Sequence, residues 1–95
     1  MISREQVVKD LKEIKAYSSN KKLQDSPIIC YAKKLQVKYN NVVANAPVSL
    51  FEFYILYYLT DIKLIDLSFD TGKSVAYLHN KKNELIDYFV KYIKE

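Results

Sequence analysis

Residues that interrupt helices are scarce in this 95-residue sequence, which contains one glycine and two prolines. Glycine and proline are the strongest helix breakers, so their scarcity favours long helices joined by short loops. Hydrophobic residues make up 49% of the chain, which is too many for a disordered protein. The length suits one small domain. We therefore predict a single all-α domain over residues 1–95.

Cysteine and long apolar runs are also nearly absent. The one cysteine, Cys30, excludes an internal disulfide. It lies between two apolar neighbours, and we expect it to behave as a small buried hydrophobe. Residues 1–17 alternate charged and apolar side chains, unlike a signal peptide. No stretch approaches the roughly 20 apolar residues of a membrane span. We therefore expect a cytoplasmic protein.

Groups for catalysis and for metal or nucleotide binding are few. The single histidine, His79, is far in sequence from Cys30, and a zinc site would need several carboxylates in addition to this pair. The run from Asp70 to Ser74 ends in Gly-Lys-Ser like a phosphate-binding loop, but it lacks the upstream glycine and a preceding strand. We predict a protein without enzymatic activity, cofactor or metal.

The net charge of +4 is unevenly distributed. Residues 1–40 carry nine basic side chains against four acidic ones, whereas residues 41–95 carry six against seven. The basic half favours an anionic partner, either a membrane surface or nucleic acid. A solvated helix face with mixed charges is the simpler interpretation.

Two helices are predicted in the first half of the chain. Ser3 and Gln6 form a capping-box pattern before a helix over residues 4–18. Ser26 and Pro27 suit the start of a second helix that reaches about Asn40. Apolar residues recur at helical spacing in both, at positions Val7, Leu11, Ile14 and Tyr17, and then Ile28, Tyr31, Leu35 and Tyr39.

A third helix is predicted after Pro47, with Ser49 and Glu52 as its capping box. Nine of the ten residues in 50–59 are apolar or aromatic. A helix that is apolar all round is usually buried on most sides, and any exposed remainder would be a docking patch. We expect Leu35 and Leu56 in the core. The candidate docking patch is the tyrosine rim Tyr54, Tyr57 and Tyr58.

The fourth predicted helix starts at Ser68, contains Gly72 near its beginning and runs to the C-terminus. Its apolar positions are Val75, Leu78, Leu85, Ile86, Phe89, Val90 and Ile93. The polar run 79–83 interrupts this pattern, either as a hinge or as an exposed turn and a half. Short connections make successive helices antiparallel neighbours, so we expect an up-down four-helix bundle with a long C-terminal helix.

A small DNA-binding regulator is the alternative prediction. Residues 64–78 can be interpreted as a helix-turn-helix with Gly72 in the turn. Two features oppose this interpretation. Val75 follows Gly72 too closely for an ordinary turn and a new helix start, and the reading segment is not strongly basic.

The order of these features matches a known family across residues 4–93. The matching segments are residues 6–11, 23–28 and 35–39, then Pro47 with Leu50, residues 58–60 with Lys63 and Leu64, and Ser68 before a long last helix. Together they resemble the enterocin A immunity family, which protects bacteria against pediocin-like (class IIa) bacteriocins. The resemblance implies a cytoplasmic four-helix bundle that binds and does not catalyse.

The resemblance also implies a partner. Members act at the inner face of the membrane, where they recognise the receptor, the membrane subunits of the mannose phosphotransferase permease, once a bacteriocin has engaged it. The C-terminal half sets which bacteriocin is countered. The family offers no invariant site residues to transfer, so we choose partner-binding candidates by expected exposure and aromatic content. They are Tyr77, His79, Asn80, Lys81, Lys82, Tyr88 and Tyr92. No nucleic-acid partner is expected from this interpretation.

Overall fold

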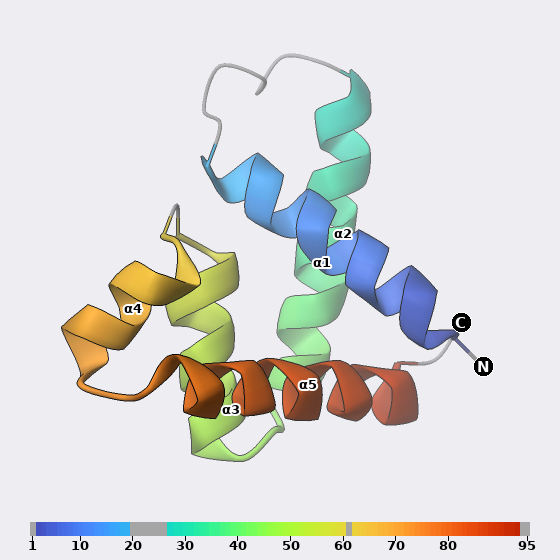
Figure 1. The fold of residues 1–95 in the computed structure, drawn as a ribbon. Helices are drawn as coiled ribbons and strands as arrows, with labels where there is room; N and C mark the ends of the chain where they lie inside the picture. Colours follow the sequence, from blue (N-terminus) through green and yellow to red (C-terminus); the bar gives the residue numbers. More distant parts are fainter. Residues whose placement is uncertain (1, 20–26, 61, 94–95) are drawn as a thin grey trace.

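The computed structural model describes residues 2–19, 27–60 and 62–93, with the side chains of all of these except 19 and 27–32. Within these ranges the regular structure is entirely helical, which confirms the all-α prediction (Figure 1). The elements are α1 (Arg4–Ser19), α2 (Pro27–Val43), α3 (Val48–Phe53), η2 (Tyr54–Tyr58), α4 (Leu64–Thr71) and α5 (Val75–Tyr92). The element η2 is a π-helical turn that continues α3 without a break.

The C-terminal helix α5 connects the rest of the fold, because α1, α2, α3 and α4 all pack against it. In Figure 1 it runs crosswise to α2 and α3, while α1 lies over the middle of α2. The short helix α4 packs against α5 and η2. Helix α5 thus contacts every other α-helix of the described part of the chain.

The core has an aromatic centre at Phe89 of α5. Its ring centroid lies 4.7 Å from that of Tyr39 on α2 and 5.9 Å from that of Tyr54 on η2. Aromatic pairs at these distances add about 0.5–1.5 kcal/mol each beyond the burial of their surface. Buried apolar residues surround them, namely Ile2, Val7, Leu11, Ile14, Leu35, Val43, Leu50, Phe53, Tyr58, Leu67, Leu78, Leu85, Ile86 and Ile93.

One carboxylate, Asp10, is buried inside this core. The Tyr39 hydroxyl donates to its Oδ2 at 2.7 Å, and the Gln6 amide donates to its Oδ1 at 2.7 Å. Burying a charge without hydrogen bonds would be costly, so these two donors make the position tolerable. The bond from Tyr39 also links α2 to α1.

Two predicted helix starts have different outcomes. Ser3 caps α1 as predicted, because its Oγ accepts from the backbone N–H of Gln6 at 3.1 Å. The prediction that Ser49 caps the third helix is wrong, since α3 begins at Val48 and Pro47 precedes it without a side-chain cap. The proline supplies a fixed φ at the start of the helix, which leaves Ser49 free to face α5.

The predicted start of the last helix at Ser68 is wrong. Residues 64–71 form the separate helix α4, and Gly72 ends it in the left-handed conformation with φ 71°. Glycine is unfavourable inside a helix but is the preferred residue just past its end, which explains the break. A new helix starts at once, because the Oγ of Ser74 accepts from the N–H of Tyr77 at 3.0 Å. The turn is therefore short enough for Val75 to begin α5.

The polar run 79–83 does not interrupt α5, which is continuous from Val75 to Tyr92. His79, Asn80 and Asn83 are exposed, so the run is the outer surface of an unbroken helix and not a hinge. The prediction of an exposed turn and a half was the correct alternative.

Several predictions fall outside the described residues. They are the cap at Ser26 and the burial of the Ile28, Cys30 and Tyr31 side chains. Among the described helices, none combines the length and the apolar character that crossing a membrane requires.

The two leucines predicted to lie in the core differ in the structure. Leu35 is 8% exposed, whereas Leu56 is 44% exposed, so the prediction for Leu56 is wrong. We expect Leu35→Ala to lower the free energy of unfolding by about 2–5 kcal/mol. Leu56→Ala, the matched control, should lower it by less than about 1 kcal/mol. Urea unfolding of both variants checks this, and equal losses would contradict the helix register described here.

Candidate functional site

The seven candidate residues on α5 do not form one surface. Tyr77, Lys81, Tyr88 and Tyr92 are separated by four, seven and four residues, which places them along one edge of the helix. Lys82 lies on the opposite edge, in a hollow shared with residues of α1. His79 and Asn80 point outward. The structure therefore brings four of the seven together.

Several side chains on this edge of α5 already interact with other residues of the chain. The Lys81 ammonium donates to the Oγ of Ser49 at 3.3 Å and pairs with Glu84 at 3.2 Å. The Tyr88 hydroxyl donates to the carbonyl of Val42 at 3.2 Å. Tyr92 lies against Tyr88 with ring centroids 4.6 Å apart. These contacts help to hold α3 and the end of α2 beside α5, so the side chains have a structural role as well as any role in binding.

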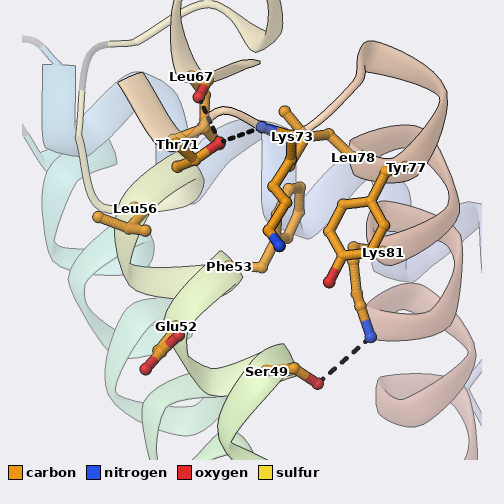
Figure 2. Close-up of a pocket in the computed structure, with 10 residues that line it drawn as sticks. All are labelled: Ser49, Glu52, Phe53, Leu56, Leu67, Thr71, Lys73, Tyr77, Leu78 and Lys81. Atoms are coloured by element: carbon orange, nitrogen blue, oxygen red, sulfur yellow. Dashed lines mark hydrogen bonds between the residues drawn. The ribbon is translucent and has the colours of Figure 1, made fainter. Parts of the chain in front are cut away.

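A hollow of about 170 Å³ opens where α3, α4 and α5 meet. Figure 2 shows its lining side chains converging from these elements, with the bond from Lys81 to Ser49 at one rim. Apolar residues form much of the wall and polar ones the rim, and the full set is Ser49, Glu52, Phe53, Leu56, Leu67, Thr71, Lys73, Tyr77, Leu78 and Lys81. The volume is smaller than that of ordinary small-molecule sites. It suits one side chain of a partner protein.

The predicted docking patch of tyrosines is wrong for two of its three members. Tyr54 is 1% exposed and Tyr58 is 3% exposed. Tyr57 is half-buried and faces α1. Leu50, Phe53, Tyr54, Tyr57 and Tyr58 recur at the spacing of one helix face, and this face is the one that packs inward. All three tyrosines therefore belong to the inward face of this helix.

The opposite face of the same helix is exposed and mostly apolar, with the charged residue Glu52 beside its apolar side chains. Its apolar residues are Val48, Phe51, Ile55 and Leu56, which we call the α3 apolar face. Phe51 and Ile55 also line a hollow of about 190 Å³ beside α2, and Leu56 lines the hollow beside α4. The third helix thus exposes an apolar remainder, although with other residues than the predicted tyrosines.

A second exposed apolar group lies on α4. Phe69 is 91% exposed and Ile65, four residues earlier, is also exposed. Leu67, between them in sequence, is buried against the core. The pair Ile65 and Phe69 therefore occupies the outer side of α4, flanked by the exposed acids Asp66 and Asp70.

The role of Lys15 on α1 was not predicted from the sequence. Its ammonium donates to the carbonyls of Tyr57 at 2.6 Å, Thr60 at 3.2 Å and Ile62 at 2.7 Å. It also lies 3.9 Å from the centroid of the Tyr57 ring. Carbonyls at a helix end lack intrahelical partners and carry partial negative charge, so a lysine is well suited to satisfy them.

Burial changes the ionisation of several side chains around η2. It raises the pKa of Tyr54, whose hydroxyl donates to Asn40 at 2.6 Å, well above the ordinary value. Burial also raises the pKa of Tyr58, with a further contribution from Tyr57. On α5, burial lowers the pKa of Lys82, and the nearby charge of Lys12 lowers it further. The two tyrosines thus stay neutral, while Lys82 is held in an unfavourable position for a cation.

Comparisons of the chain with protein-family models, with curated proteins and with solved structures found no match. The family resemblance therefore remains a prediction from the sequence segments quoted above. Within the described part of the chain, no group of three or more His, Cys, Asp or Glu side chains is placed to hold a metal ion.

Removing the Lys15 ammonium should destabilise the fold. Lys15→Met keeps the aliphatic part of the side chain and deletes three bonds to carbonyls, so we expect a loss of about 1.5–3 kcal/mol in the free energy of unfolding. Lys9→Met, an exposed lysine on the same helix, is the matched control and should change stability by less than about 0.5 kcal/mol. Similar values for the two variants in urea unfolding would refute the capping role.

Proposed function

We propose that this chain is an immunity protein of the enterocin A immunity type, which protects its cell against a class IIa-type bacteriocin. It binds the receptor, the membrane subunits of the mannose phosphotransferase permease, from the cytoplasmic side while the bacteriocin is engaged. The α3 apolar face carries the proposal, together with the resemblance across residues 4–93. This mode of protection requires binding and no catalytic step.

The α3 apolar face has the chemistry of a protein-docking surface. Phe51, Ile55 and Leu56 are large apolar side chains that the chain itself leaves partly uncovered. Clusters of this kind mark contacts with proteins or membranes. The hollows on either side, beside α2 and beside α4, each suit one apolar side chain of a partner. A partner helix that lies along α3 would fill both, as in other helix-in-groove complexes.

Specificity in this proposal belongs to the edge of α5 beside α3. Tyr77 is exposed and lines the hollow between α3 and α5, together with Lys81. A partner docked on the α3 apolar face would therefore reach both side chains. Tyrosines with exposed rings are effective in recognition, because they offer large contact areas with few rotatable bonds. This agrees with the family trait of specificity in the C-terminal half.

The proposal includes an adapted family architecture. In this proposal the four helices of the family are α1, α2, α3 with η2, and α5, and the up-down arrangement is modified because α5 crosses α2 and α3 (Figure 1). Helix α4 and the turn at residues 72–74 form an additional unit between the third and the last of these.

The α3 apolar face is testable in cells. The double variant Phe51→Ser/Ile55→Ser, expressed in a bacteriocin-sensitive strain, should lower the tolerated bacteriocin concentration by about tenfold or more, since two central apolar contacts are lost. The control Ile65→Ser/Phe69→Ser removes two apolar residues of α4 that are more exposed than Phe51 and Ile55, and it should protect like the wild type. Circular dichroism establishes that both variants are folded.

Two outcomes would contradict this assignment. Equal protection by the two double variants would show that the α3 apolar face is not the docking site. Loss of bacteriocin activity on mixing with the purified wild-type chain in solution would show that protection does not act through a receptor.

A DNA-binding function is the second candidate, because the structure removes one objection to it. Helices α4 and α5 are joined by the three-residue turn 72–74, as a helix-turn-helix requires. Exposed Asp66 and Asp70 on α4 oppose it, since the first helix of that motif lies near the phosphate backbone. Fluorescence anisotropy with duplex DNA decides the matter. A DNA-binding regulator would bind the duplex tightly at low salt and lose affinity steeply as the salt concentration rises. An immunity protein is expected not to bind the duplex, even at low salt.

A further inference from the structure

A hollow of about 110 Å³ between α1, η2 and α5 is lined by three lysines, two tyrosines and two apolar residues. The lysines are Lys12 and Lys15 of α1 and Lys82 of α5. No acidic residue belongs to the lining. Three cationic side chains therefore converge on a small space from two helices that are distant in sequence.

The Lys15 ammonium donates hydrogen bonds within the fold to three carbonyls at and after the end of η2. The situation of Lys12 and Lys82 is different. Among the described residues, no carboxylate lies within ion-pair distance of either lysine. The nearest acids on α5 are used elsewhere, because Asp87 pairs with Arg4 and Glu84 pairs with Lys81. Two like charges thus face one hollow without a counter-charge from these residues.

The surroundings of Lys82 make its positive charge unfavourable. Lys82 is partly buried, and both burial and Lys12 disfavour its charged form. Val8 and Ile86 contribute apolar walls. Lys12 is exposed, so an anion can enter from solvent and interact most strongly with the partly buried Lys82 ammonium. The arrangement is costly when empty and becomes favourable when an anion bridges the two lysines.

We infer that Lys12 and Lys82 form a binding site for a phosphate group. Lysine binds phosphate as a point charge, and charge-assisted hydrogen bonds to phosphate oxygens are among the strongest in proteins. The phosphate can belong to a lipid headgroup or to a free phosphate ion, which share this chemistry. This inference does not rest on the proposed immunity function.

The first test uses inorganic phosphate as the probe. Sodium phosphate is titrated into the full-length chain at constant ionic strength, and the methyl resonances of Val8 and Ile86 are followed by NMR. We expect saturable shifts for the wild type. Lys12→Gln and Lys82→Gln should each weaken binding by about tenfold, as the loss of one charge-assisted bond implies. Lys9→Gln removes the same charge from an exposed neighbouring position and should bind within about twofold of the wild type.

The second arm distinguishes the source of the phosphate group. Flotation with phosphatidylcholine vesicles, with and without phosphatidylglycerol, measures lipid binding by the same four proteins. Binding to the anionic vesicles that Lys12→Gln and Lys82→Gln abolish, and Lys9→Gln does not, would assign the site to a lipid headgroup. Phosphate binding without vesicle binding would assign it to a free ion. Linear, unsaturated shifts in the first arm together with equal effects of all three variants in the second would overturn the inference.

Discussion

The Lys15 ammonium, which donates to one carbonyl within the π-helical turn η2 and to two beyond it, fixes how the first and third helices meet. A helix end that points at another element needs partners for its free carbonyls, and here α1 supplies them. The bond to Tyr57 holds η2 in one rotation relative to α1, with Tyr54 and Tyr58 turned into the core. The same rotation leaves Phe51 and Ile55 outward, so the candidate docking surface depends on this contact.

Features governed by local sequence were predictable. The cap at Ser3 and the stripe Val7, Leu11 and Ile14 predicted α1 correctly, because a capping side chain and a single apolar face act within a few residues. Gly72 was misinterpreted as an interior residue, although its backbone freedom suits the end of α4. The error at Leu56 arose because a helix that is apolar on nearly every side offers little contrast between its faces, and Phe51 on the exposed face is as aromatic as Phe53 on the buried one.

The candidate sites depend on packing between distant segments, which the sequence does not display. Tyr77 and Lys81 gain their setting from α3, and Lys82 gains its setting from α1. The contact between Asp10 and Tyr39 joins two residues that are 29 positions apart in the sequence. Residue type and helical position thus predicted which side chains lie on α5. They did not predict that some of these side chains face α3 and others face α1.

We propose that the chain recognises a receptor that a bacteriocin has engaged. The most direct measurement is the binding of the labelled chain to membrane vesicles that contain or lack the mannose phosphotransferase permease, each with and without a class IIa bacteriocin. We expect the chain to bind the vesicles only when permease and bacteriocin are both present. An absence of binding under that condition, with the bacteriocin itself shown to occupy the permease, would contradict it.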